Sequence, residues 1–286
     1  MSQGAHARLE AKRSALSDVL QAMERVAVAF SGGTDSAYLL AACIDALGAD
    51  NVVAYTVDSP LLPREELVRA RRVAEALGAQ HRVLAMDELA LPEIVANDGL
   101  RCYHCKRHRF EQLRALLGEV GHETVLVHGE NADDAGDYRP GARAAHELGV
   151  RAPLAEVGLS KAEIRELSRQ RGLETWDLPA AACLASRVPY GTPLSLKTLQ
   201  RIQAAEAAVV RLTRVRRVRV RDHFPLARIE VSAESISDLS RQPVREQIVE
   251  ALLGLGYRYV TLDLAGYRMG SLNDELGTSE QASASE

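Results

Sequence analysis

The sequence predicts an α/β protein in which a parallel sheet, covered by helices on both faces, precedes a smaller C-terminal α+β domain. Short apolar, β-branched runs alternate with helix-like stretches through the first half of the chain, an order typical of β-α-β units. Beyond about residue 195 the strand-like segments alternate charged with apolar residues, which is typical of a half-exposed sheet. A chain of 286 residues, 47% of them hydrophobic, is long enough for two unequal domains.

The parallel sheet is predicted to begin with apolar strands at 26–30 and 52–57, separated by a helical stretch that ends at Gly48. A second helix is expected between Pro63 and Gly78, because proline favours the first turn of a helix and glycine its end. These segments form the first β-α-β-α order of the chain.

Two further strands are predicted at 81–86 and 123–129, with a helix over 109–121 between them. Ser160 and Glu163 have the spacing of a capping box, which predicts another helix ending near residue 172. Sheets of this kind bind ligands beyond the carboxyl ends of their strands. We therefore expect the strand-end residues to share one crevice: 31–36, 58–59 and 129–134.

Residues 175–193 are irregular and rich in proline, which predicts a functional loop that leads to a domain boundary. Trp176, the only tryptophan, is expected to pack in the core beneath this loop. We divide the chain into a nucleotide-binding domain over 1–194 and a small α+β domain over 195–271, with helices around 196–212 and 235–253. The polar, serine-rich residues 272–286 are expected to be disordered.

Charge and composition exclude several classes of protein. With 35 basic and 39 acidic side chains the net charge is −4, so no global cationic field favours nucleic acid, and we expect a small anionic substrate instead. The N-terminal segment lacks the apolar core of a signal peptide, and no run of about 18 apolar residues occurs. We therefore expect a cytoplasmic protein with no membrane partner. Four cysteines are too few for a disulfide scaffold, which favours thiol or metal chemistry.

The hexapeptide Ser31-Gly32-Gly33-Thr34-Asp35-Ser36 lies between a predicted buried strand and a predicted helix. Backbone N–H groups at such a helix start can hold a phosphate, and glycines permit its close approach. Ser31 and Ser36 add hydroxyl donors, whereas Asp35 needs a cation or a structural hydrogen bond beside a phosphate and is expected to orient the loop. The alternative interpretation is a plain glycine turn with a helix cap.

SGGTDS resembles the SGGxDS signature of the PP-loop ATP pyrophosphatases, which have an adenine nucleotide alpha hydrolase-like fold and cleave ATP between the α- and β-phosphates. It lacks the lysine of a Walker loop, which disfavours γ-phosphoryl transfer. Four further segments, in order, resemble the LarE sulfur transferases of nickel-pincer cofactor synthesis: RCYHCK at 101–106, GENADDAGDYRPG at 129–141, ELGVRAPLAEVGLSK at 147–161 and TWDLPAAACLASRVPYG at 175–191.

The resemblance to LarE implies a reaction with ATP and Mg²⁺. ATP adenylates a carboxylate of a pyridinium-3,5-dicarboxylate mononucleotide and releases pyrophosphate, and sulfur then displaces AMP to give a thiocarboxylate. Asp58 and Ser59 are candidate ribose or adenine contacts, although an Asp-Ser-Pro turn explains them equally well. Gly129 ends a strand beside the same crevice and completes the predicted nucleotide site.

Three cysteines are candidate sulfur-handling residues. Cys102 and Cys105 form a CxxC pair, which alone could be a redox pair, half of a zinc site or a coincidence. The resemblance places Cys183 at the sulfur-donor position. Three thiolates suit a 4Fe–4S cluster with one iron open for sulfide, which we favour over a zinc site completed by His104 or His108 and over a sacrificial Cys183 that becomes dehydroalanine. Cys43 fits the apolar pattern of its helix and is expected to be buried.

Charged residues complete the expected substrate site. Arg219 and Arg221 alternate with valines, so a strand places both guanidinium groups on one face, where they suit phosphate and carboxylates; a solvated sheet face is the alternative. The resemblance supports the substrate interpretation. Glu130 is a candidate substrate contact and, with Asp133 and Asp134, could hold Mg²⁺ or position Cys183, although acidic residues there also cap helices. Arg187, beside the thiols, is a further candidate substrate contact.

Two other functions remain open from the sequence. A tRNA thiolase shares adenylation and the three-cysteine pattern, and the strip RVRRVRVR at 214–221 is basic, but the net charge disfavours it. A non-catalytic nucleotide-binding or iron–sulfur carrier protein would explain the glycines and the thiols separately. We also expect a homo-oligomer.

Overall fold

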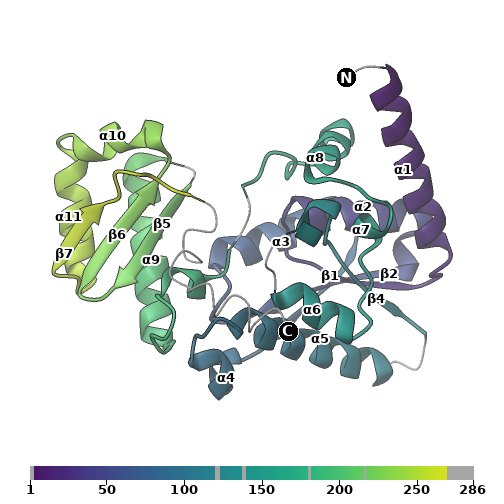
Figure 1. The fold of residues 1–286 in the computed structure, drawn as a ribbon, viewed down its shortest axis with the longest axis horizontal. Helices are drawn as coiled ribbons and strands as arrows, with labels where there is room; N and C mark the ends of the chain where they lie inside the picture. Colours follow the sequence, from purple (N-terminus) through teal and green to yellow (C-terminus); the bar gives the residue numbers. More distant parts are fainter. Residues whose placement is uncertain (1–2, 120–122, 137–139, 180–181, 216, 269–286) are drawn as a thin grey trace. The chain divides into compact units, whose positions relative to one another are not determined.

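The computed structural model describes residues 3–119, 123–136, 140–179, 182–215 and 217–268, and the chain divides into two compact units (Figure 1). The first unit comprises Met1–Met86 and Cys102–Ala181, and the second comprises Asp87–Arg101 and Ala182–Glu286. The predicted domain boundary between 194 and 195 stays a prediction. The tail over 272–286 lies outside the described residues.

The first unit contains a four-stranded parallel sheet in the order β3-β2-β1-β4, which confirms the predicted α/β class. Its strands are β1 (Val26–Ala29), β2 (Val52–Asp58), β3 (Gln80–Ala85) and β4 (Val125–His128). Ala29 lies opposite Tyr55 on one side and His128 on the other. The loops that follow β1 and β4 therefore leave the sheet at the same edge.

Helices cover both faces of this sheet (Figure 1). The helices of this unit are α1 (Gln3–Gln21), α2 (Thr34–Leu47), α3 (Arg64–Ala76), α5 (Arg101–Glu119, of which Arg101 belongs to the second unit), α6 (Pro140–Glu147), α7 (Pro153–Glu156) and α8 (Lys161–Gln170). Successive residues of β1 point to opposite faces, so Val28 joins the core with α1, α2 and α8, whereas Ala27 joins the core with α5 and α6. Two separate hydrophobic layers thus hold β1 in place.

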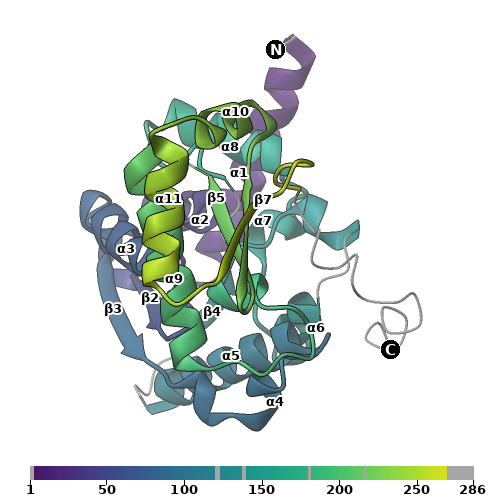
Figure 2. The ribbon, with the colours of Figure 1, turned by 90° about the vertical axis from the view of Figure 1, so that its left-hand side faces the viewer.

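The second unit is a three-stranded sheet backed by helices, which confirms the smaller α+β fold. The strands β5 (Val218–His223), β6 (Leu226–Val231) and β7 (Tyr259–Leu262) lie in that order, with β5 and β6 antiparallel and β6 and β7 parallel. The helices are α4 (Pro92–Val95), α9 (Leu196–Thr213), α10 (Ile236–Ser240) and α11 (Val244–Gly254). Figure 2 shows α11 and α9 beside the sheet, and their buried residues pack on the valine face of β5.

The second unit differs from the sequence prediction in one helix. The helix expected over 235–253 is two helices, because Arg241 is extended and Pro243, which has no N–H, precedes α11. Five short 3-10 segments complete the described structure: Ala49–Asn51, Glu88–Ala90, Ala132–Gly136, η4 (Leu184–Arg187) and Ala233–Ser235. Within the described ranges, no helix is both long and apolar enough to cross a membrane.

Candidate active site

The phosphate loop connects β1 to α2 as the sequence predicts. Gly33 is the N-cap residue of α2 and has no side chain, so the helix start lacks the usual side-chain cap. Ser31 Oγ and Ser36 Oγ lie 3.1 Å apart, and the N–H of Gly33 points to Ser31 Oγ at 3.3 Å. The loop therefore gathers the hydroxyl groups of Ser31 and Ser36 and backbone N–H groups at the start of α2.

Two glycines are required by close packing around this loop. Gly32 has φ +71°, and a Cβ there would lie 2.7 Å from the Cα of Ala70 on α3. A Cβ on Gly129 would lie 2.8 Å from the backbone N of Ser36. Gly129 thus lets the end of β4 approach the first turn of α2, a packing role that stands beside its predicted nucleotide role.

Asp35 pairs with a lysine that the sequence motifs do not single out. Lys161 Nζ donates to Asp35 Oδ2 at 2.6 Å, and burial raises the pKa of Asp35 although the bond from Lys161 opposes this shift. Lys161 is the first residue of α8, whose N-terminus is fixed by the predicted capping box of Ser160 and Glu163. The capping box is the sequence signal that could have found Lys161, because it predicts where the helix starts and hence which lysine is its first residue.

A hydrogen bond also ties the loop helix to the segment after α8. Thr34 Oγ1 donates to the carbonyl oxygen of Thr175 at 2.7 Å, and both residues are buried. The next residue, Trp176, is 41% exposed, so the prediction that it packs in the core is wrong. The backbone of 175 is held inside while the indole faces solvent.

Asp58 and Ser59 follow β2 and take part in a turn. Asp58 pairs with Arg64 at 2.5 Å, and Arg64 also donates to the Ser59 carbonyl oxygen at 2.7 Å. Ser59 Oγ accepts from the N–H of Leu61 at 3.2 Å and from Arg109 at 3.4 Å. These bonds support the turn interpretation, and the ribose or adenine contact stays a prediction.

The acidic residues after β4 are held mainly by backbone groups. Asp134 accepts from the N–H of Asn131 at 3.1 Å, and Asp133 accepts from the N–H of Lys161 at 2.9 Å. Glu130 lies 3.5 Å from His128, whose pKa is lowered to about 3 by burial and by Lys106, so this contact is no ion pair near neutral pH. In the part of the chain that the structure describes, no three His, Cys, Asp or Glu side chains form a group that could hold a metal ion.

The cysteines are divided between the two units. Cys102 and Cys105 belong to the first unit, one turn apart on α5, where Cys102 is exposed and Cys105 is half-buried. Cys183 belongs to the second unit, is half-buried and forms the N-cap of η4. A three-thiolate site is therefore not formed within either unit. Cys43 is fully buried as predicted, and burial raises its pKa to about 12.

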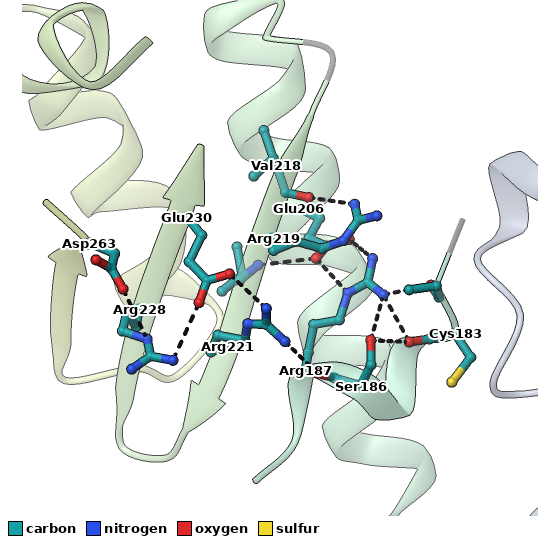
Figure 3. A network of polar contacts seen from close by, with 12 residues as sticks. Cys183, Ser186, Arg187, Glu206, Val218, Arg219, Arg221, Arg228, Glu230 and Asp263 are labelled. Carbon is teal, nitrogen blue, oxygen red and sulfur yellow. Dashed lines mark hydrogen bonds and ion pairs between the residues drawn. The ribbon is translucent and has the colours of Figure 1, made fainter. Parts of the chain in front are cut away.

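A network of buried charges lies beside Cys183 in the second unit (Figure 3). Arg187 is 2% exposed and pairs with Glu206 on α9, and Arg221 pairs with Glu230 on β6 at 2.7 Å. No sequence motif indicates Glu206, which occupies a polar position of an amphipathic helix. The network brings together Cys183, Arg187 and Arg221 of the predicted site.

Arg219 and Arg228 occupy the same sheet face as Arg221, as the alternating pattern predicts. Arg219 Nη1 donates to the Val218 carbonyl oxygen at 2.9 Å, and its guanidinium lies 5.6 Å from the ring of Tyr267. Arg228 lies 3.3 Å from Glu230. This face is rich in arginine, and substrate binding there stays a prediction.

Comparison with known proteins gives matches over almost the whole chain. The asparagine synthase family model matches residues 10–133, which include the phosphate loop. An uncharacterized protein of Synechocystis is 41% identical over 265 residues, covering 93% of this chain and 98% of that protein. The pyridinium-3,5-bisthiocarboxylic acid mononucleotide synthase of Lactiplantibacillus plantarum is 37% identical over 276 residues, covering 96% of this chain and 99% of that protein.

These matches extend through both compact units and agree with the phosphate loop between β1 and α2. An alignment of this length and identity goes well beyond a shared nucleotide-binding fold. The chain belongs to the LarE family of ATP-dependent sulfur transferases, enzymes of the PP-loop superfamily.

Proposed function

We propose that this chain adenylates a carboxylate of a pyridinium-3,5-dicarboxylate mononucleotide and replaces the AMP with sulfur, giving a thiocarboxylate. The observation that carries the proposal is the loop of SGGTDS between β1 and α2, with an uncapped helix start and a lysine held beside it. The relative from Lactiplantibacillus plantarum, which is named for a bisthiocarboxylic acid mononucleotide, supplies the substrate class.

The residues of the first unit would bind and orient ATP. N–H groups at the start of α2 and the hydroxyls of Ser31 and Ser36 suit the phosphates, and Lys161 adds a positive charge that Asp35 holds in place. Lys161 would face the pyrophosphate, where negative charge develops. Mg²⁺ bound to ATP would neutralise further charge on the leaving group, and Glu130 is the candidate carboxylate ligand of that Mg²⁺.

The proposed chemistry has two balanced steps. A carboxylate oxygen of the substrate attacks the α-phosphorus of ATP, the bond from that phosphorus to the bridging oxygen breaks, and pyrophosphate leaves. A sulfur nucleophile then attacks the acyl carbon of the adenylate, and AMP leaves with the oxygen that joined it to the acyl group. Adenylation is needed because a free carboxylate is a poor acyl donor, whereas AMP is a good leaving group.

The source of the sulfur is proposed to depend on Cys183. In one form Cys183 attacks the adenylate, and loss of its α-hydrogen with cleavage of its Cβ–S bond leaves the thiocarboxylate and dehydroalanine. In the other, Cys102, Cys105 and Cys183 would hold a 4Fe–4S cluster. Of these three thiols, only Cys102 and Cys105, at positions i and i+3 of α5, are available to bind a cluster within one unit, because Cys183 belongs to the other unit. We therefore route no step through a cluster.

The proposal is tested by the nucleotide products. Purified full-length protein is incubated with ATP, Mg²⁺ and the dicarboxylate mononucleotide, and the nucleotides are separated by chromatography. We expect AMP and pyrophosphate in equal amounts, both dependent on the mononucleotide. ADP and orthophosphate as the first products would contradict the assignment. Pyrophosphate release without thiocarboxylate would limit the function to adenylation.

A further inference from the structure

Arg187 is a fully charged side chain with almost no contact with solvent. It is 2% exposed, and its guanidinium bonds within the second unit on two sides (Figure 3). On one side, Nε and Nη2 donate to the two carboxylate oxygens of Glu206 at 2.9 and 3.1 Å. On the other side, Nη1 donates to the carbonyl oxygens of Ala182 and Cys183 at 2.6 and 2.8 Å, and to Ser186 Oγ at 3.1 Å. All three nitrogens of the planar guanidinium therefore donate, two of them to one carboxylate and the third to the turn.

The carbonyl oxygen of Cys183 is the point where these bonds converge. Besides Arg187, it accepts from Ser186 Oγ at 2.8 Å and from the N–H of Ser186 at 3.0 Å. Three donors on one carbonyl fix the peptide plane that carries the Cys183 side chain. In Figure 3 the sulfur of Cys183 points away from the guanidinium of Arg187, so the arginine holds the main chain and leaves the thiol clear.

The 183–187 turn is also connected to strand β5, through Glu206 and Arg221. Glu206 accepts from the backbone N–H of Val220 on β5 at 3.0 Å. Arg221 donates to the carbonyl oxygen of Ser186 at 2.6 Å and pairs with Glu230. The 183–187 turn is therefore tied to α9 by the buried ion pair of Arg187 with Glu206, and to β5 by the hydrogen bond from Arg221, which its pair with Glu230 holds in place.

We propose that Arg187 is a positioning residue that fixes the main chain of Cys183 for sulfur transfer, and that it does not contact the substrate. The proposal rests on the proposed function, in which Cys183 handles sulfur. It replaces the interpretation of Arg187 as a substrate contact, because its guanidinium is buried and faces Glu206 and the turn carbonyls. A misplacement of a reacting group by about 1 Å can lower a rate about 100-fold.

Lysine is the informative replacement. It keeps the positive charge, but its three donors share one nitrogen and cannot span Glu206 and the two turn carbonyls together. A binding site for an anion would tolerate lysine better than a geometric clamp would. A second variant, R187M/E206Q, removes both charges and so leaves no buried charge unpaired if R187K folds poorly.

The experiment compares full-length wild type, R187K, R187M/E206Q and C183A, with R245K as a control on an exposed arginine of α11. Pyrophosphate release and thiocarboxylate formation are measured in single turnovers over a range of mononucleotide concentrations. Alkylation of each cysteine by iodoacetamide is followed separately by peptide mass spectrometry. Thermal unfolding verifies that each variant is folded.

In R187K and R187M/E206Q we expect adenylation and KM for the mononucleotide within about twofold of wild type, and sulfur transfer slower by about 10- to 100-fold. Alkylation of Cys183 should speed up, while that of Cys102 should not change. A higher KM with an unchanged transfer rate, or full transfer in R187K, would overturn the proposal. Failure of the proposed function has a different signature, namely no pyrophosphate from wild type or full transfer by C183A.

Discussion

Arg219 and Arg221 lie two residues apart on one face of β5 but differ in their surroundings. Arg221 is 6% exposed and is bonded to Glu230 and to the Ser186 carbonyl oxygen. Arg219 is half-buried at the edge of the sheet and stacks near Tyr267. If the face binds an anionic substrate, Arg219 is the better placed of the two for direct contact, and Arg221 would act mainly by supporting the turn.

Replacing Arg219 with alanine should therefore weaken use of the mononucleotide. We expect KM for the mononucleotide to rise about tenfold, the loss of roughly one charge-assisted hydrogen bond, with KM for ATP unchanged. Initial rates of pyrophosphate release measure both constants. R211A, on the exposed side of α9, is the matched control. An equal loss for ATP and the mononucleotide in folded R219A would mean that its partner has been misassigned.

His128 makes stability depend on pH. Burial lowers its pKa to about 3, whereas the unfolded value is about 6.5, so below pH 6.5 the unfolded chain binds a proton that the folded chain excludes. This effect lowers the free energy of unfolding by up to about 1.4 kcal/mol per pH unit as the pH falls below 6.5. We expect H128Q to lose less stability than wild type between pH 7.5 and 5 in urea unfolding. The exposed-histidine control H146Q should behave as wild type, and an H128Q curve parallel to wild type would contradict the assignment.

The elements around the phosphate loop were predictable because their signals are local. An apolar run, two glycines and a helix start give β1, the loop and α2 directly. The first helix, α1, was not predicted, although Leu9, Leu16 and Leu20 are spaced along one helical face and are buried in the core. Its amphipathic signal is weak, because small and polar residues separate these leucines.

Gly32 offers a test of whether the phosphate loop binds ATP. G32A places a Cβ 2.7 Å from the Cα of Ala70 in a left-handed conformation, so we expect about 1–2 kcal/mol of lost stability and at least tenfold weaker ATP binding. Gly48 has φ +78° and nothing within 4 Å of the position that a Cβ would take, so G48A should carry the cost of the positive φ without a clash and keep its ATP affinity. Calorimetric titration and thermal unfolding measure both, and equal ATP affinity in the two variants would remove the loop from the nucleotide site.

At the scale of the whole molecule, some contacts within the second unit could not be read from the chain. Asn97 is fully buried with φ +55°, and its Nδ2 donates to the carbonyl oxygens of Pro189 and Thr192 at 2.9 and 3.0 Å. The bond to Pro189 joins residues 92 apart in the sequence, and the N–H groups of Gly191 and Leu194 donate to Asn97 and Val95, so 87–101 is held to the C-terminal residues of the second unit. No periodicity marks such a bond, since a single amide satisfies several loop carbonyls.

The three candidate thiols belong to two units, so the source of the sulfur has to be determined in the full-length chain. If the three share a cluster, C102A and C105A should each lose iron and multiple turnover together, because two thiolates hold a cubane poorly. If Cys183 is sacrificed, both variants should keep one turnover, and the chain should become lighter by about 34 Da. Iron analysis, anaerobic spectra and intact mass distinguish the outcomes, and multiple turnover by C183A would exclude both.

The hydrogen bond from Thr34 to Thr175 gives the chain an internal optical reporter. Its donor lies in the first turn of the phosphate-loop helix, and its acceptor directly precedes the chain's single tryptophan, which is exposed. A ligand that tightens the loop would be sensed one residue away by an indole in contact with water. We expect the emission of Trp176 to change in wavelength or intensity on titration with a non-hydrolysable ATP analogue, and T34V to uncouple that signal while binding persists in calorimetry. Unlabelled protein would then report nucleotide occupancy in real time, separately from any chemistry at sulfur.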